Sequence, residues 1–170
     1  MELSDRILVK NIGAILQKKG QTLSVAESCT GGLVGMLLTS EPGSSEWFIG
    51  GIIAYADRIK TDLLGVPKEM IQEYGSVSNE VVAAMAGGIR SLTGTDYSLS
   101  VSGIAGPAGG TLEKPVGTVC MAVDSARSCT TAMKCFSDPL SNPHSREVVR
   151  KASASYLLSM LYSKLREDEE

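Results

Sequence analysis

The sequence predicts an α/β fold, with residues 1–170 forming a single three-layer α/β/α domain around a mixed sheet, and three observations support this. Runs of strand-like composition alternate with runs of helical period along most of the chain. Two β-rich runs near the end, 116–123 and 130–136, are joined by a short turn, which indicates an antiparallel hairpin. A chain of 170 residues, 43% hydrophobic and 21% charged, has the composition of one ordinary globular domain.

The individual elements follow from apolar periodicity and from residues that begin or end helices. The first helix is expected at 4–19, because Leu8, Ile12 and Leu16 lie on one face and Gly20 follows as a helix-ending glycine. The run 47–55 is apolar without a helical period, so a buried strand is expected there. The acidic end of the chain is expected to fray. The remaining elements are expected as strands at 21–26 and 97–102, and as helices at 33–40, at 57–64 with Leu63 and Leu64 buried, at 68–74, at 79–92 with Ser78 as N-cap, and at 145–165.

Charge, cysteine content and hydropathy limit the function classes. A net charge of −3 argues against a nucleic-acid-binding protein, which needs a basic surface. The four cysteines form no Cys-x-x-Cys motif and His144 is the one histidine, so neither a metal site nor another cofactor is expected. The N-terminal residues contain no apolar signal core, and no run approaches the ~20 apolar residues of a membrane span. Together with free thiols, these features predict a cytoplasmic protein.

The stretch 25–32, Val-Ala-Glu-Ser-Cys-Thr-Gly-Gly, has the features of a functional turn between a strand and a helix. It places a serine, a cysteine and a threonine where a helix begins. The first turn of a helix has unpaired N–H groups and the positive end of the dipole, and glycines allow a ligand close to the backbone. The turn is therefore suited either to a phosphate or to an oxyanion beside an attacking hydroxyl.

Six motifs in one order, from about residue 5 to 162, resemble a known family. They resemble the C-terminal domain of the competence/damage-inducible protein CinA and its stand-alone relatives, which include the nicotinamide-nucleotide amidohydrolases, or NMN deamidases. The motifs are the turn 26–32, Pro-Gly-Ser-Ser at 42–45 with Trp47-Phe48, Tyr55 with Lys60 and Leu-Gly-Val at 64–66, Gly-x-Val-Ser-x-Glu at 75–80, Ser-Gly-Ile-Ala-Gly-Pro-x-Gly-Gly at 102–110, and Lys-Pro-Val-Gly-Thr-Val at 114–119.

The resemblance implies an enzyme of pyridine nucleotide (NAD) metabolism with an α/β/α fold. Such an amidohydrolase converts the carboxamide of nicotinamide mononucleotide (NMN) to nicotinate mononucleotide and ammonia, with a serine–lysine pair and no metal. The serine and lysine that match are Ser28 and Lys60. The resemblance, together with the small-residue helix at 79–92, also favours a homodimer or higher homo-oligomer, with no nucleic-acid or membrane partner.

Amide hydrolysis needs a nucleophile, a base, a proton for the leaving ammonia and a site for the oxyanion. Ser28 supplies the nucleophile, and Lys60 is a suitable base if the end of the apolar strand leaves it partly buried and neutral. Tyr55 is expected to tune Lys60 or to orient the substrate. Backbone N–H groups from Thr30 to Gly32 are expected to hold the oxyanion.

The expected contacts to the substrate come from three segments, and the sequence leaves open which of them binds the phosphate. Arg146 and Arg150 lie one helical turn apart at the start of the last helix. Just before them, His144-Ser145 replaces the Gly-Asp that is usual in the family. The predicted contact residues are Glu27, Thr30, Gly31 and Gly32 of the turn, Ser102, Gly103, Gly106 and Gly109 of the glycine loop, and Arg146 and Arg150.

Several alternatives remain open at this stage. Ser28 is also a plausible helix cap, Lys60 a plausible solvated lysine, and Glu27 a residue that orders the turn through hydrogen bonds. A thiol hydrolase would use Cys29 with His144 as base. Another alternative to the serine amidohydrolase is a nucleotide-binding or interaction domain of the CinA type without catalysis.

Overall fold

The computed structural model describes residues 3–136 and 146–169, so the expected loop at 137–143 and His144 lie outside the described residues. Twelve elements follow one another, and most lie within a few residues of their expected positions. They are α1 (Leu3–Lys19), β1 (Leu23–Glu27), α2 (Leu33–Thr39), a 3₁₀ turn η1 (Ser44–Glu46), β2 (Phe48–Ile53), α3 (Asp57–Leu64), α4 (Lys68–Tyr74), α5 (Asn79–Thr93), β3 (Tyr97–Gly103), β4 (Thr118–Ser125), β5 (Cys129–Cys135) and α6 (Arg146–Glu167).

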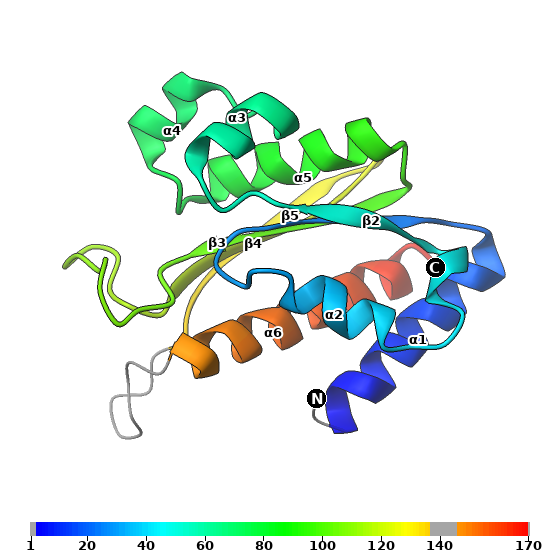
Figure 1. Cartoon of the computed structure of the whole chain (residues 1–170). Coiled ribbons are helices and arrows are strands. Elements are labelled where there is room, and N and C mark those ends of the chain that lie inside the picture. The colour runs from blue at the N-terminus through cyan, green and yellow to red at the C-terminus, as the bar shows by residue number, and fades with distance from the viewer. Residues whose placement is uncertain (1–2, 137–145, 170) are drawn as a thin grey trace.

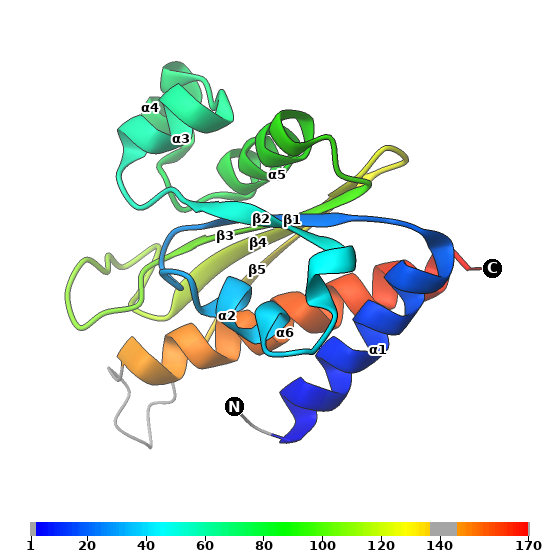
Figure 2. The same cartoon turned by 45° about the vertical axis from the view of Figure 1, so that its right-hand side comes forward.

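A five-stranded sheet in the order β2-β1-β3-β4-β5 forms the middle layer. β1 runs parallel to β2 and β3, whereas β3, β4 and β5 pair antiparallel, so the predicted hairpin and the mixed sheet are confirmed. Helices α3, α4 and α5 cover one face, and α1, α2 and α6 cover the other (Figures 1 and 2). The predicted three-layer α/β/α architecture is therefore confirmed.

Helix α5 is fixed to the sheet by hydrogen bonds as well as by apolar packing. Its predicted cap is present, since the Ser78 hydroxyl accepts the Val81 N–H. Two buried serines of β3, Ser98 and Ser100, donate their hydroxyls to backbone carbonyls of α5, at 2.7 Å and 2.5 Å. Buried hydroxyls are costly unless they are paired, and here each finds a helix carbonyl.

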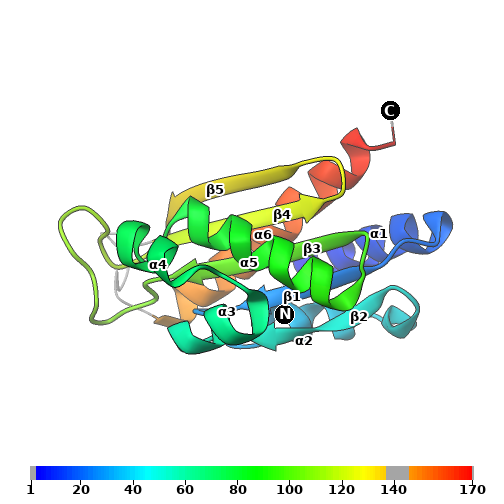
Figure 3. The ribbon, with the colours of Figure 1, turned by 90° about the horizontal axis from the view of Figure 1, so that it is seen from above.

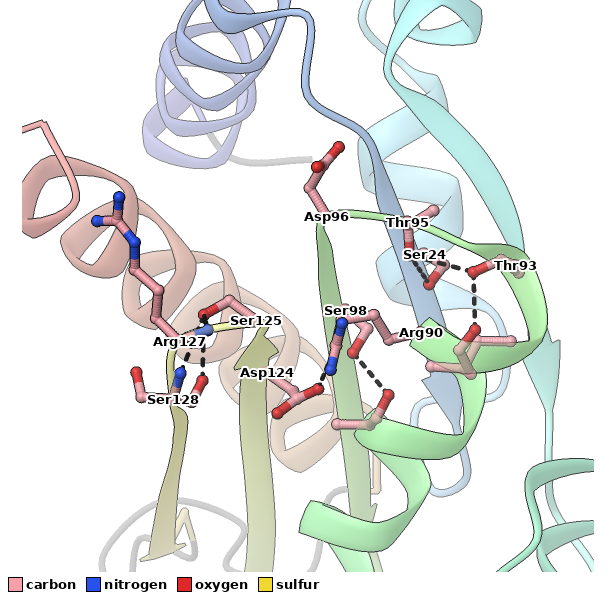
Figure 4. Close-up of polar contacts among 12 residues, drawn as sticks. Ser24, Arg90, Thr93, Thr95, Asp96, Ser98, Asp124, Ser125, Arg127 and Ser128 are labelled. Carbon is pink, nitrogen blue, oxygen red and sulfur yellow. Dashed lines mark hydrogen bonds and ion pairs between the residues drawn. The ribbon is translucent and has the colours of Figure 1, made fainter.

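Polar side chains also pair with one another at the amino-terminal ends of β1 and β3 (Figure 4). The hydroxyls of Ser24 and Thr95 lie 2.8 Å apart, and Thr95 is 3.1 Å from the hydroxyl of Thr93. Arg90 of α5 donates through Nε to Asp124 of β4 at 2.6 Å. Internal hydrogen bonds therefore hold this end of the sheet, and the opposite end carries the candidate site.

Three details differ from expectation. The strand at 47–55 was expected to be buried, but β2 is an edge strand with Ile49 and Ile53 more than half exposed, because strand order cannot be read from its composition. Leu63 is 51% exposed, since only Leu64 faces the core. At the acidic end, where fraying was expected, Asp168 accepts hydrogen bonds from the Tyr97 hydroxyl at 2.7 Å and from Lys164 at 3.2 Å.

Candidate active site

A cleft of about 240 Å³ opens where the parallel strands β1 and β2 and the strand β3 end. The carboxyl ends of parallel strands are the usual ligand-binding edge of an α/β sheet. Six residues predicted from the sequence lie together here. The cleft is lined by Ser28, Tyr55, Lys60, Ser102, Gly103 and Arg146, and also by Cys29, Asp57, Ser76 and Val77.

Ser28 is the first residue after β1, and its backbone N–H donates to the Val101 carbonyl of β3 at 2.9 Å. This bond extends the β1–β3 pairing by one residue and fixes the serine at the cleft. Within residues 3–136 and 146–169, the Ser28 hydroxyl has no hydrogen-bond partner. The hydroxyl is therefore available to a ligand in the cleft.

Lys60 is almost completely buried, at 1% exposure, so it is not a solvated surface lysine. Its Nζ donates to the Asp57 carboxylate at 3.0 Å, and the same oxygen accepts the Ser76 hydroxyl at 2.7 Å. Burial alone would raise the pKa of Asp57, but the Ser76 hydroxyl and the charge of Lys60 outweigh it and hold that pKa below its usual value. Asp57 and Ser76 thus fix the lysine amine in the wall of the cleft.

A hydrogen-bonded chain continues from this group across the cleft. The Ser102 hydroxyl, at the end of β3, donates to the Ser76 carbonyl at 2.7 Å. Lys114 donates to the carbonyls of Tyr74 and Val77 at 2.9 and 2.7 Å, and so holds the loop that carries Ser76. Sequence reasoning assigned no site role to Asp57, Ser76 or Lys114.

Arg146 connects the glycine loop to the tyrosine of the cleft. Its Nη2 donates to the Tyr55 hydroxyl oxygen at 2.8 Å, and its Nη1 donates to the Gly106 carbonyl at 3.1 Å. Gly106 and Gly109 have positive φ values of 85° and 95° but do not line the cleft. Of the predicted glycine loop, only Gly103 reaches the cleft, beside Ser102. The Arg146 guanidinium thus joins the glycine loop to the wall of the cleft.

Glu27 orders the turn from within and does not line the cleft. Its buried carboxylate accepts the Thr30 hydroxyl at 2.6 Å and the N–H groups of Gly32, Val34 and Gly35 at 2.8–3.1 Å. This carboxylate occupies the amino terminus of α2, where a negative charge is favoured by the helix dipole. The sequence left two roles open for Glu27, contact with the substrate and ordering of the turn. These hydrogen bonds correspond to ordering of the turn.

Thr30–Gly32 were expected to supply N–H groups for an oxyanion, but the N–H groups of both glycines are engaged within the turn. The Gly31 N–H donates to the Ser28 carbonyl at 3.1 Å, and the Gly32 N–H donates to Glu27. Both glycines have positive φ, 61° and 95°, so their role is to form the tight turn. Thr30 is fully buried, which also keeps it away from a ligand.

Arg150 lies one turn after Arg146 but contacts the turn and not the cleft. Its Nε and Nη2 donate to the Thr30 carbonyl at 3.0 and 2.6 Å. This bidentate arrangement fixes the turn to α6. Arg146 and Arg150 therefore hold different parts of the site, and only Arg146 borders the cleft.

Cys29 lies in the cleft wall, but its thiol is poorly suited to nucleophilic attack. Burial raises the pKa of Cys29 to about 12, despite the opposing effects of a backbone hydrogen bond and of Arg146 and Arg150. The thiolate is the reactive form of cysteine, and such a thiol stays protonated at neutral pH. His144, which a thiol hydrolase based on Cys29 would use as its base, lies outside the described residues.

Sequence and structure comparisons show the family and the fold. The family model described as CinA C-terminal domain matches residues 5–165. The chain belongs to the CinA C-terminal domain family. A CinA-like protein of Parasynechococcus marenigrum is 54% identical over 135 residues, covering 79% of this chain and 32% of that protein. A CinA-like protein of Desulfotalea psychrophila is 48% identical over 157 residues, covering 92% of this chain and 37% of that protein.

This chain therefore spans about a third of the length of these curated CinA-like relatives. Solved structures of the CinA group match it along almost their whole length. The competence/damage inducible protein CihA from Agrobacterium tumefaciens superposes with a TM-score of 0.90 at 33% identity, covering 98% of this chain and 99% of that one. A competence or damage-inducible protein from Enterobacter asburiae gives 0.88 at 31% identity, covering 95% and 98%. Among the described residues, no helix is long and apolar enough to cross a membrane.

Proposed function

We propose that this chain hydrolyses the carboxamide of NMN to nicotinate mononucleotide and ammonia in pyridine nucleotide salvage. The observation that carries the proposal is the buried Lys60 amine in the same cleft as the Ser28 hydroxyl, which has no hydrogen-bond partner among the described residues. A buried lysine in a cleft is the kind of group that serves as a base. The resemblance to the NMN deamidases supplies the substrate.

In this reaction Ser28 Oγ attacks the carboxamide carbon while the Lys60 amine, which this step requires in its neutral form, takes the hydroxyl proton. Lys60 then gives that proton to the departing nitrogen, and ammonia leaves an acyl-enzyme ester on Ser28. Water attacks the ester, Lys60 accepts its proton, and the proton returns to Ser28 Oγ as nicotinate mononucleotide is released. The residues of this chain thus supply both the nucleophile and the proton carrier.

Tyr55 is the proposed donor to the developing oxyanion, because the glycine amides of the turn are engaged. Its oxygen accepts a hydrogen bond from Arg146, and among the described residues its own O–H has no acceptor, so it can donate toward the carbonyl oxygen. The cleft is smaller than the ~300–1,000 Å³ of sites that enclose whole drug-sized ligands. We therefore place the nicotinamide ring inside and the phosphate at the mouth, near Arg146.

One observation favours the non-catalytic alternative. Lys60 Nζ bonds to Asp57 and not to Ser28, and a lysine held as an ion pair cannot accept a proton. In that case the cleft binds a nucleotide without cleaving it. Both functions predict that NMN binds in the cleft, but only hydrolysis predicts that ammonia is released. An assay of ammonia release therefore distinguishes them.

The test is ammonia release from NMN in the presence of EDTA, with wild type, Ser28→Ala and Lys60→Met. Methionine keeps the apolar stem of the buried lysine and removes the amine. Lys68→Met, at an exposed position on α4, is the matched control. Activity that survives EDTA and the control but is lost in both site variants supports the amidohydrolase. Inactive wild type with an NMN-dependent rise in melting temperature supports the binding domain instead.

A further inference from the structure

The carboxylate of Asp57 lies in the wall of the cleft, beside the Lys60 amine. Asp57 is the first residue of α3, one of the three helices that cover one face of the sheet (Figure 3). Its side chain is 54% exposed, whereas that of Lys60 is 2% exposed. Asp57 therefore presents its carboxylate to a molecule that enters the cleft.

The two oxygens of this carboxylate differ in their partners. Oδ1 accepts both the Lys60 amine, at 3.0 Å, and the Ser76 hydroxyl, at 2.7 Å. In the part of the chain that the structure describes, Oδ2 has no hydrogen-bond partner. Although burial alone would raise the pKa of Asp57, the Ser76 hydroxyl and Lys60 hold it below its usual value, so the group is ionised at neutral pH. An ionised carboxylate only accepts hydrogen bonds, so Oδ2 requires a donor from the ligand.

Asp57 also supplies the negative charge of the cleft. Of the described residues that line the cleft, the other charged ones are Lys60 and Arg146. Two cations attract a ligand with a carboxylate on its ring, so a lining with these charges alone would favour a pyridine acid over the corresponding amide. The Asp57 carboxylate offsets this attraction, because it repels a second carboxylate placed beside it.

We propose that Asp57 is the residue through which the cleft distinguishes a pyridine carboxamide from the corresponding pyridine carboxylate. Oδ2 accepts an N–H of the carboxamide NH₂ group. A carboxylate in the same place offers no donor and carries the same charge as Asp57, so the attractive and the repulsive contribution act in the same direction. This inference rests on the proposed function, since NMN and nicotinate mononucleotide differ only in this group. Asp57 thus helps to hold the substrate and to release the product.

The substitution Asp57→Asn reverses this preference with little change of shape. The amide oxygen of asparagine can keep both donors of Oδ1, from Lys60 and Ser76, so the NH₂ group takes the place of Oδ2. A donor then faces the ligand where an acceptor was, and the negative charge is absent. Loss of a hydrogen bond to a charged group weakens binding about tenfold or more, and loss of repulsion from a nearby like charge strengthens it about fivefold or more.

The test is the affinity of the full chain for NMN and for nicotinate mononucleotide, measured by calorimetry in a Ser28→Ala background so that neither nucleotide is consumed. We expect Asp57→Asn to bind NMN about tenfold more weakly and nicotinate mononucleotide about fivefold more tightly. Asp62→Asn is the matched control, because it removes the same charge from an exposed position of α3 that does not line the cleft. It should leave both affinities unchanged. Circular dichroism confirms that each variant is folded.

Several results would overturn the inference. If Asp57→Asn weakens both nucleotides equally, Asp57 contacts a part that they share, such as the ribose. An unchanged ratio of the two affinities, or a Ser28→Ala protein that binds neither nucleotide, also refutes it. Ammonia release from wild type tests the proposed function separately. A protein with the expected shift in preference but no ammonia release would retain the inference and refute hydrolysis, whereas ammonia release with an unchanged ratio would refute the inference alone.

Discussion

The carboxylate of Glu27 gives the sharpest prediction, because four donors converge on it. Glutamine keeps the shape of the side chain, but its NH₂ group must replace one carboxylate oxygen. The less costly placement sets this NH₂ against the Gly35 N–H, since Oε2 accepts three donors and Oε1 only one. One charge-assisted hydrogen bond is then lost, and so is the negative charge at the amino terminus of α2.

The expected magnitude follows from these two losses. A hydrogen bond to a charged group contributes about 1.5–3 kcal/mol, and a charge at a helix terminus contributes about 0.3–1 kcal/mol. Glu27→Gln should therefore lower the free energy of unfolding by roughly 2–4 kcal/mol. For a chain of this size each kcal/mol corresponds to about 2–4 °C, which predicts a fall in melting temperature of about 4–16 °C.

The assay is thermal unfolding followed by circular dichroism, with Glu46→Gln as the matched control. Glu46 is exposed and accepts one hydrogen bond, from Gln17 at 3.1 Å, so its variant should melt within about 2 °C of wild type. If Glu27→Gln melts together with Glu46→Gln, the carboxylate does not stabilise the turn and the reasoning is refuted.

Three further predictions concern α6, Tyr97 and Cys29. Arg150→Ala removes two hydrogen bonds to the Thr30 carbonyl and should lower the free energy of unfolding by about 1–3 kcal/mol, measured by urea titration. Burial and the hydrogen bond to Asp168 raise the pKa of Tyr97 to about 12, so its neutral form stabilises the fold below pH 10 and this contribution is lost as the pH rises through 12. Between pH 9 and 12, the melting temperature of wild type should therefore fall further than that of Tyr97→Phe. Cys29→Ser should retain NMN hydrolysis, and alkylation at pH 8 should label exposed Cys135 before Cys29.

Each of these has a clear opposing result. An unchanged urea midpoint in Arg150→Ala would mean that α6 does not fix the turn. Equal alkaline losses in wild type and Tyr97→Phe would show that the phenol does not titrate with unfolding. Loss of activity in Cys29→Ser, with the fold intact, would revive the thiol mechanism.

Local rules predicted most of the fold from the sequence. The Ser78 cap, Gly20 after the end of α1 and the hairpin of β4 and β5 all depend on neighbouring residues, which is why they could be predicted directly. The meeting of Ser28, Tyr55 and Lys60 followed from two facts: strands of an α/β sheet end at one edge, and the motifs resemble those of one family.

What the sequence could not show depends on contacts between distant segments. An apolar run such as 47–55 looks the same in the centre of a sheet as at its edge, because only the strand order distinguishes them. The amino terminus of α2 looked available to a ligand, but Glu27 fills it, and sequence alone cannot exclude such a bond. The spacing of Asp57 and Lys60, three residues apart at a helix start, was the one local signal for that ion pair.

The serine–carbonyl bonds between β3 and α5 have a mechanical consequence. Alternate strand residues lie about 6.6–6.8 Å apart, and four helix residues span about 6 Å, so Ser98 and Ser100 match the carbonyls of Ala86 and Val82. Ser102 continues the series to the Ser76 carbonyl. Sliding α5 by one residue would break both bonds to the helix together and would also displace the loop before it, which carries Ser76. The position of β3, which ends at the cleft, relative to the loop that holds Asp57 is therefore set along the length of the strand, including by the buried hydroxyls of Ser98 and Ser100, which no ligand can reach.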